Sequence, residues 1–230
     1  MILKNLHLMC CAAALLLPLC VGCASAPKRT ETLTDWIENG QRRGTIKKII
    51  EGGQQEWRYL DARGRVVRIE KRNLEGEPLA GALVQTFSWR DDGKLLEERF
   101  STAAGKPAAC RAGYVIRRYS YSTTDDGDRV VTTSYFSDEN TPVCVNARYA
   151  ICQNIYRGLG DDTRKVLLSD EQGKPASAVW DSVRGVARVE YHWLMGATPV
   201  RCGVYYGPDA KVVERRVLSG ETHTVKTGYY

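Results

Sequence analysis

Hydrophobic and polar residues alternate with a period of two over several stretches of the chain. The clearest stretch puts four apolar residues on one side and three polar residues on the other: Ala187, Val189, Tyr191 and Trp193 against Arg188, Glu190 and His192. Residues 149–156 alternate in a similar way. Successive side chains of a strand point to opposite faces, so this pattern predicts strands with one buried face. Helical periodicity is weak after residue 50, and we predict an all-β fold.

From Trp57 onward the chain repeats a unit whose closing prolines are about 30–35 residues apart. Each unit has an aromatic strand end, an Asp/Gly turn, a β-branched strand and a closing turn that ends in proline. Glycine supplies the left-handed backbone of a tight hairpin. Proline lacks an amide donor and is expected to block further pairing. The turns are at Asp61–Gly64, Asp91–Gly93, Asp125–Gly127 and Gly160–Asp162, the closing prolines are Pro78, Pro107, Pro142 and Pro175, and a partial unit spans Tyr205–Val217.

The unit reads aromatic-x-Asp-x-x-Gly-(Lys/Arg)-hydrophobic-hydrophobic, as in the run from Tyr59 to Val67. It resembles the tandem β-hairpin repeats of bacterial surface proteins, such as the YD/RHS and MORN-like families. The resemblance covers about residues 55–218. It implies tandem antiparallel β-hairpins that form a meandering sheet or a short stack, in which each unit packs only against its neighbours.

The first 22 residues differ from the rest of the chain. Lys4 is followed by an apolar run from Leu6 to Val21, interrupted only by His7 and Pro18. The run is too short and too interrupted for a stable membrane span. A charged start, an apolar run and then small residues are typical of a secretory signal peptide, which we predict for residues 1–22.

The end of this run, Leu19-Cys20-Val21-Gly22-Cys23, resembles the lipobox of bacterial lipoprotein precursors. The resemblance implies that the signal is cut before Cys23 and that the Cys23 thiol receives a diacylglycerol. It places the mature chain in the bacterial cell envelope, outside the cytoplasm and anchored to a membrane by lipid. Ala24 follows the cysteine where Asp tends to retain lipoproteins in the inner membrane, so the outer membrane of a Gram-negative cell is favoured.

The remaining chain is divided by composition. Residues 23–34 are rich in Ser, Thr, Pro and Lys and are predicted to form a lipidated flexible tether. The β-hairpin repeat domain is assigned to residues 35–220, with a first strand at residues 45–50. Residues 221–230 are a polar C-terminal tail.

Eight cysteines are present, and the signal peptide and the lipid site account for four of them. The even number that remains in an exported domain favours two disulfides. Free buried thiols are the alternative, and the spacing disfavours a zinc site. Three of the four follow a proline by two or three residues, which gives a preference for Cys110–Cys144 with Cys152–Cys202.

Tyr205 and Tyr206 are the aromatic residues proposed as exposed ligand contacts for a sugar or peptide. His192 falls on the polar face of its strand, where a solvated histidine is expected. The acid pairs lie in predicted turns, where Asp bonds its own backbone. The sequence contains no nucleophile motif and suggests no catalytic residue, metal site or cofactor.

The chain has 230 residues, of which 43% are hydrophobic and 26% charged, an ordinary globular composition. Its formal charge of +6 becomes +5 once residues 1–22 and their single Lys are removed. The basic residues are scattered among acids, which argues against nucleic-acid binding.

Taken together, the sequence predicts a membrane-anchored envelope module that binds a protein or glycan partner. An envelope hydrolase whose residues come from separate repeats, and a structural subunit of an envelope complex, are the alternatives. The sequence leaves the oligomeric state open.

Overall fold

The computed structural model describes residues 29–146, 148–158, 162–194 and 200–218. These residues form fifteen β-strands and no helix, which confirms the all-β prediction. The strands are β1 (Thr30–Glu38), β2 (Gln41–Glu51), β3 (Gln54–Asp61), β4 (Val66–Arg72), β5 (Val84–Trp89), β6 (Leu95–Ser101), β7 (Ile116–Thr123), β8 (Arg129–Phe136), β9 (Ile151–Tyr156), β10 (Thr163–Ser169), β11 (Ala178–Trp180), β12 (Val183–Val186), β13 (Arg188–Leu194), β14 (Val200–Tyr206) and β15 (Val212–Leu218).

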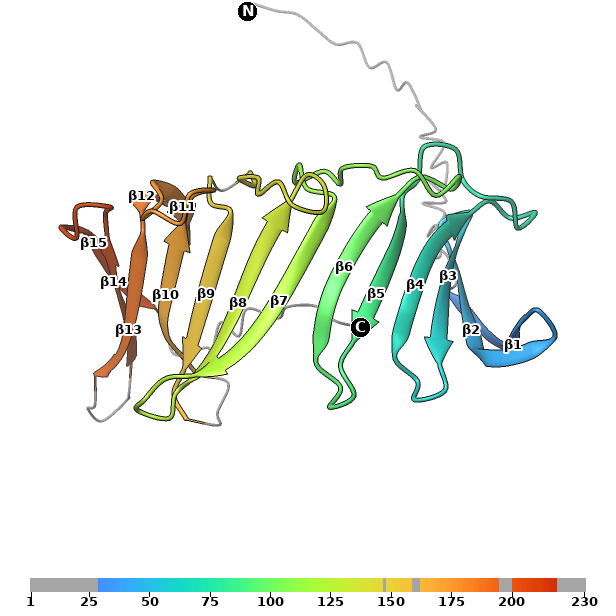
Figure 1. Ribbon diagram of the computed structural model, residues 1–230, viewed down its shortest axis with the longest axis horizontal. Coiled ribbons are helices and arrows are strands. Elements are labelled where there is room, and N and C mark those ends of the chain that lie inside the picture. Colours follow the sequence, from blue (N-terminus) through green and yellow to red (C-terminus); the bar gives the residue numbers. More distant parts are fainter. Residues whose placement is uncertain (1–28, 147, 159–161, 195–199, 219–230) are drawn as a thin grey trace, which may run out of the picture.

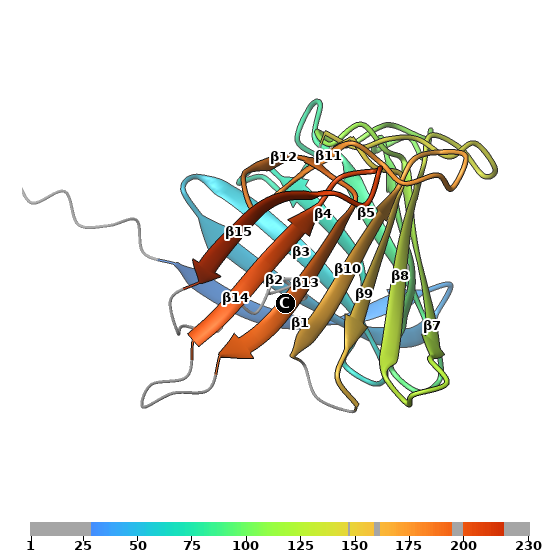
Figure 2. The same cartoon turned by 90° about the vertical axis from the view of Figure 1, so that its left-hand side faces the viewer.

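Thirteen strands form one antiparallel sheet in chain order, and β11 with β12 makes a separate hairpin between β10 and β13 (Figure 1). The predicted meander of hairpins is therefore confirmed. The sheet curves strongly along its length but does not close, and β1 and β15 are its two edges (Figure 2). Among the described residues, no helix offers a segment able to cross a membrane.

The Asp/Gly turns have the predicted backbone. At the first turn the Gly64 amide donates to the Asp61 carbonyl, the Asp61 amide donates to the Arg65 carbonyl, and Gly64 has φ of +75°. The same pair of hydrogen bonds recurs at Gly93 and Gly127. The fourth predicted turn lies partly outside the described residues.

The closing turns differ from the prediction. Each closing proline lies directly opposite the last residue of the preceding strand: Arg72↔Pro78, Ser101↔Pro107, Phe136↔Pro142 and Ser169↔Pro175. The next residue then donates back to that strand, as the Leu79 amide does to the Lys71 carbonyl (2.9 Å). Proline therefore does not end pairing here, because it occupies a position whose amide is not needed for the ladder.

The two faces of the sheet are built differently. The face that we call the groove face carries a row of directly opposed residues that crosses five strands: Lys47, Arg58, Ile69, Gln85 and Phe100. The opposite face carries cross-strand ion pairs, such as Arg118 with Glu97 and with Glu139, both at 2.8 Å. The opposite face also buries Tyr59, whose ring meets that of Trp36 edge-to-face at 5.3 Å, so aromatic packing is present on both faces.

The main buried cluster lies on the groove face towards the C-terminal end of the sheet, beneath the β11–β12 hairpin. Val166, Leu168 and Val189 from the sheet are each at most 1% exposed. The hairpin adds Ala178, Val183 and Val186 to the same cluster. The burial of Ala187 and Val189 confirms the alternation predicted for this strand.

The N-terminal boundary of the sheet was predicted too late. β1 begins at Thr30, inside the segment expected to be a tether, and the expected first strand at 45–50 lies within β2. β1 was missed because it is an edge strand rich in Thr, with Leu33 and Ile37 68% and 63% exposed, so its composition resembles that of a linker. The signal peptide, Cys23 and the 221–230 tail lie outside the described residues.

Candidate functional site

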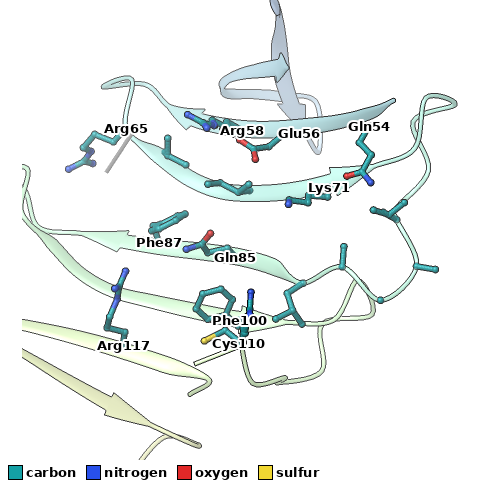
Figure 3. Close-up of a pocket in the computed structure, with 18 of the residues that line it drawn as sticks. Gln54, Glu56, Arg58, Arg65, Lys71, Gln85, Phe87, Phe100, Cys110 and Arg117 are labelled. Atoms are coloured by element: carbon teal, nitrogen blue, oxygen red, sulfur yellow. Dashed lines mark hydrogen bonds and ion pairs between the residues drawn. The ribbon is translucent and has the colours of Figure 1, made fainter. Parts of the chain in front are cut away.

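A hollow of about 970 Å³ lies on the groove face over β3 to β7 (Figure 3). Its apolar lining comes from alternate residues of neighbouring strands and from the segment that connects β4 to β5. The principal apolar contributors are Val66, Ile69, Leu83, Phe87, Trp89 and Phe100. A volume of this size is at the upper end of the range for small-molecule sites, about 300–1,000 Å³.

The hollow exists because the first link between units is short. Residues 79–83 join Pro78 to β5, whereas residues 108–115 and 143–150 join the next two closing prolines to β7 and β9. All three links make a tight turn, but each longer link then delivers a tyrosine, Tyr114 or Tyr149, to the groove face. The short link is Leu-Ala-Gly-Ala-Leu and has no aromatic residue to fill the same space.

An aromatic row makes this difference visible. Ring centroids follow one another at 5.6 Å from Phe100 to Tyr114, 4.9 Å to Tyr135, 5.9 Å to Tyr149 and 6.2 Å to Trp180. Edge-to-face contacts at these spacings are favourable. Phe100 is the end of this row, and its side chain borders the hollow.

Five cations line the hollow, and they differ in how they are neutralised. Arg58 donates to Glu56 (2.6 Å), Arg65 pairs with Asp61 (2.7 Å) and Arg117 pairs with Glu98. The side chains of the other two, Lys71 and Arg111, are exposed and make no hydrogen bond or ion pair with another described residue. The positive charge available to a ligand is therefore at these two residues.

The floor of the site contains a buried charge. Glu98 on β6 is 2% exposed, lies directly opposite Arg117 on β7, and accepts a hydrogen bond from the Gln85 side chain. Burial raises the pKa of the Glu98 carboxyl, and the attraction of Arg117 only partly offsets it. A buried carboxylate is costly unless it is paired, so this trio fixes the positions of Gln85 and Arg117 beside the hollow.

A smaller polar hollow of about 240 Å³ adjoins the first and shares Gln54, Glu56, Arg58 and Lys71 with it. Arg29, the first described residue, lines its far side. The two hollows thus form one groove, which runs from the apolar wall at Val66 and Trp89 towards the point where the N-terminal segment enters the sheet.

Tyr205 does not have the exposed position predicted for it. It is fully buried, and its hydroxyl donates to the Asp181 carboxylate at 3.0 Å, beside a second such bond from Tyr191 at 2.9 Å. Burial raises the pKa of both tyrosines. Tyr205 is thus a core residue, next to a hollow of about 420 Å³.

Tyr206 lies on the opposite face of the sheet, half-buried. Arg188 stacks over its ring at 4.0 Å, and its hydroxyl donates weakly to Glu190 at 3.4 Å. The structure therefore separates the two tyrosines instead of joining them in one site. His192 is on the same face as Tyr206, with its side chain 55% exposed and 3.9 Å from Glu190.

The four cysteines of the described domain are free thiols. Cys152 faces the groove side opposite Leu168, whereas Cys202 points to the other face opposite His192. Their strands are three positions apart in the sheet, or about 14 Å. The preferred Cys152–Cys202 disulfide is therefore wrong for this fold.

The sequence argument for a Cys110–Cys144 disulfide assumed that the two cysteines occupy matching positions in neighbouring units, and they do not. The turn that begins at Cys110 matches the turn that begins at Val145, so Cys144 is one residue out of register with Cys110. Burial raises the pKa of Cys152 to about 12 and, together with Glu171, that of Cys144 to about 11. Thiols with such high pKa values are poor nucleophiles.

Sequence reasoning did not find the groove. The signal was the short, small-residue link at residues 79–83, which differs from the two links that follow it. Among the described residues, no group of three or more His, Cys, Asp or Glu side chains comes together as a metal site. No protein-family model and no curated protein matches the chain.

Proposed function

We propose that the chain is an envelope lipoprotein, anchored through Cys23, whose β-sheet domain is a binding module for an anionic ligand held in the groove. Cys23 supplies the location, as the lipobox resemblance implies, and the groove supplies the binding surface. The enzyme and structural-subunit alternatives gain no specific support from the geometry of the groove.

One observation carries the proposal: two unpaired cations, Lys71 and Arg111, border a large hollow with a mainly apolar lining. An unpaired ammonium or guanidinium beside an apolar wall favours a ligand that brings both a negative charge and apolar surface. The neighbouring Arg58, Arg65 and Arg117 are already paired and mainly hold the walls in place.

The anchor is tested by intact-mass analysis of the full chain recovered from a bacterial membrane fraction. We expect a mass that begins at Cys23 and carries two or three acyl chains, because one chain alone binds a membrane only marginally. A mass that retains residues 1–22, or a different start without lipid, would remove the anchor from the proposal.

The groove is tested by thermal unfolding with three acidic probes: inorganic polyphosphate, soluble peptidoglycan fragments and palmitate. A ligand at about 100 times its Kd stabilises the folded state by about 2.7 kcal/mol. For a domain of about 200 residues this raises the unfolding midpoint by about 5–10 °C. We expect at least one probe to do so.

The matched variants are two charge reversals each. Lys71→Glu with Arg111→Glu should abolish the shift, whereas Lys106→Glu with Lys174→Glu, in closing turns away from the groove, should keep it. If no probe moves the midpoint of the wild-type chain, or if both double variants respond alike, the groove is not the binding site.

A further inference from the structure

The groove has a gradient of polarity along its length. On β4, Val66, Ile69 and Lys71 line it in that order, which spans about 17 Å at strand geometry. The end at Val66 and Trp89 is apolar, and its only cation, Arg65, is held by Asp61 and by the Arg90 carbonyl. The end at Lys71 and Gln54 continues into the polar hollow.

The apolar wall is mainly aliphatic. Leu79, Ala80, Ala82 and Leu83 of the short link face the same hollow as Val66 and Ile69. Sugar rings need closely spaced hydrogen-bonding groups, and the polar side chains at this wall are already occupied with one another. A flexible hydrocarbon chain needs only apolar surface and a path long enough to lie in.

The polar end of the groove faces the start of the sheet. Arg29 lines it and is six residues from Cys23 in the sequence. Arg29 itself is paired with Glu31 at 2.7 Å. Six residues span at most about 20 Å. If Cys23 is lipidated, as proposed above, the polar mouth of the groove is held within that distance of the membrane surface.

We infer that the ligand of the groove is an anionic amphiphile with a single hydrocarbon chain. Its carboxylate or phosphate head lies at Lys71 and its chain runs along Ile69, Leu83 and Phe87 towards Trp89. The inference rests on the proposed function and names the class of ligand that the groove takes. Each methylene buried should strengthen binding roughly fourfold until the apolar wall is filled.

The probe is palmitate with a photoreactive diazirine in its chain, added to the full chain purified in a non-ionic detergent. After illumination, mass spectrometry of the digested protein locates the label. We expect the label within residues 64–100, and at least tenfold less label with the methyl ester, which has no charge for Lys71 to bind.

Two variants separate the head from the chain. Lys71→Glu should reduce labelling about tenfold, and because this side chain is exposed the variant should fold normally. Leu83→Tyr supplies a ring like those that later links deliver, which should obstruct the path of the hydrocarbon chain and reduce labelling about tenfold. Lys174→Glu is the matched charge control and should label as the wild type does.

The source of the chain is settled in a second arm, with the diazirine placed in an acyl chain of phosphatidylglycerol vesicles. Labelling by free palmitate alone indicates a fatty-acid ligand, and labelling from vesicles as well indicates extraction from the bilayer. Either result supports the amphiphile. Equal labelling by acid and ester, or label that is undiminished in Leu83→Tyr, overturns it.

The failure of this inference can be distinguished from failure of the proposed function. If peptidoglycan fragments or polyphosphate raise the unfolding midpoint and Lys71→Glu with Arg111→Glu removes that effect, while palmitate neither labels nor stabilises, the groove binds anions but not amphiphiles. If no probe acts at the groove, both are wrong.

Discussion

The two ends of the sheet are built from the same kinds of strand and turn, yet the groove face is covered by a hairpin at one end and open at the other. At the C-terminal end the β11–β12 hairpin lies over Val166, Leu168 and Val189, which are almost inaccessible to solvent. At the N-terminal end the groove face between β3 and β7 holds a hollow, a buried carboxylate and five cations.

The difference arises in the links rather than in the strands. The links at residues 108–115 and 143–150 place Tyr114 and Tyr149 on the groove face, where they complete an aromatic row with three residues of the strands: Phe100, Tyr135 and Trp180. The link at residues 79–83 ends in Leu83 and leaves the space open. In a repeat sheet of this kind, the strands provide a uniform scaffold, and a shortened link is enough to leave a hollow in one part of the groove face.

The largest effect should come from a core truncation at the covered end. Leu168 is 1% exposed inside the main cluster, and Leu168→Ala should lower the free energy of unfolding by about 3–4 kcal/mol, since it removes buried methyl groups and leaves a cavity. Urea denaturation measures the change.

The same substitution at the open end provides the control. Leu96 on β6 is 39% exposed, and Leu96→Ala should cost only about 1–2 kcal/mol, because its side chain is partly exposed and its removal leaves no enclosed cavity. Equal losses at the two positions would show that the covered end contributes no more to stability than the open end.

The second effect concerns the buried carboxylate under the groove. Glu98→Ala removes the buried carboxylate that pairs with Arg117 and should destabilise the chain by about 2–3 kcal/mol. Replacing both with apolar residues, as in Glu98→Leu with Arg117→Met, should recover most of the loss, because no charge is then left unpaired. Urea denaturation of the wild type, Glu98→Leu, Arg117→Met and the double variant gives the coupling free energy.

The double variant also sharpens the comparison between the ends. If Glu98→Leu with Arg117→Met is as unstable as Glu98→Ala, apolar residues cannot replace the ion pair beneath the groove. The open end would then depend on this charge pair as the covered end depends on its apolar cluster.

The sequence was sufficient for the repeating part of the fold. Alternation at residues 187–193 and glycine turns at Gly64, Gly93 and Gly127 are local signals, because each depends on residues close together in the chain. These predictions are confirmed by the strand pairing and by the positive φ angles. β1 was missed because an exposed edge strand has no buried face to show in its pattern.

The groove could not be read in the same way. The links of the later units place a tyrosine on the groove face, and residues 79–83 do not. That this leaves a hollow follows only from how the strands and links pack together, which the local sequence does not specify. Tyr205 shows the converse error: its neighbour Tyr206 and its aromatic character suggested an exposed contact, but Asp181, 24 residues away, binds its hydroxyl in the core.

A third and smaller effect should be the same at both ends. Gly64 and Gly173 have φ of +75° and +77°, and a Cβ added at either would contact nothing within 4 Å. Gly64→Ala and Gly173→Ala should therefore each cost about 1 kcal/mol, the penalty of a left-handed conformation for a residue with a side chain. Thermal unfolding of the pair measures it, and a large excess at one end would mean that the turns, as well as the links, differ between the two regions.

The smallest effect concerns pH and separates two carboxylates of the open end. For Asp61, burial alone would raise the pKa, but hydrogen bonds from the Arg65 side chain and from the Arg65 and Arg63 amides outweigh it and lower the pKa below 3.8. A lowered pKa contributes stability that is fully present above 3.8 and is lost as pH falls through the folded-state value. Glu98 has the opposite sign, since its raised pKa imposes a cost that is absent below 4.5 and complete above the raised folded-state value.

Asp61→Asn should accordingly destabilise the chain by less than about 1 kcal/mol near neutral pH, because Asn keeps one acceptor oxygen but loses the charge. The difference from wild type should shrink as pH falls through the lowered folded-state pKa of Asp61, below which the carboxyl is protonated in both states. Urea denaturation at several pH values measures both changes. A difference in stability that stays constant as pH falls through that pKa would mean that the turn depends on the shape of the Asp61 side chain rather than on its ionisation. The charge of Asp61 would then not be what holds Arg65 away from the groove.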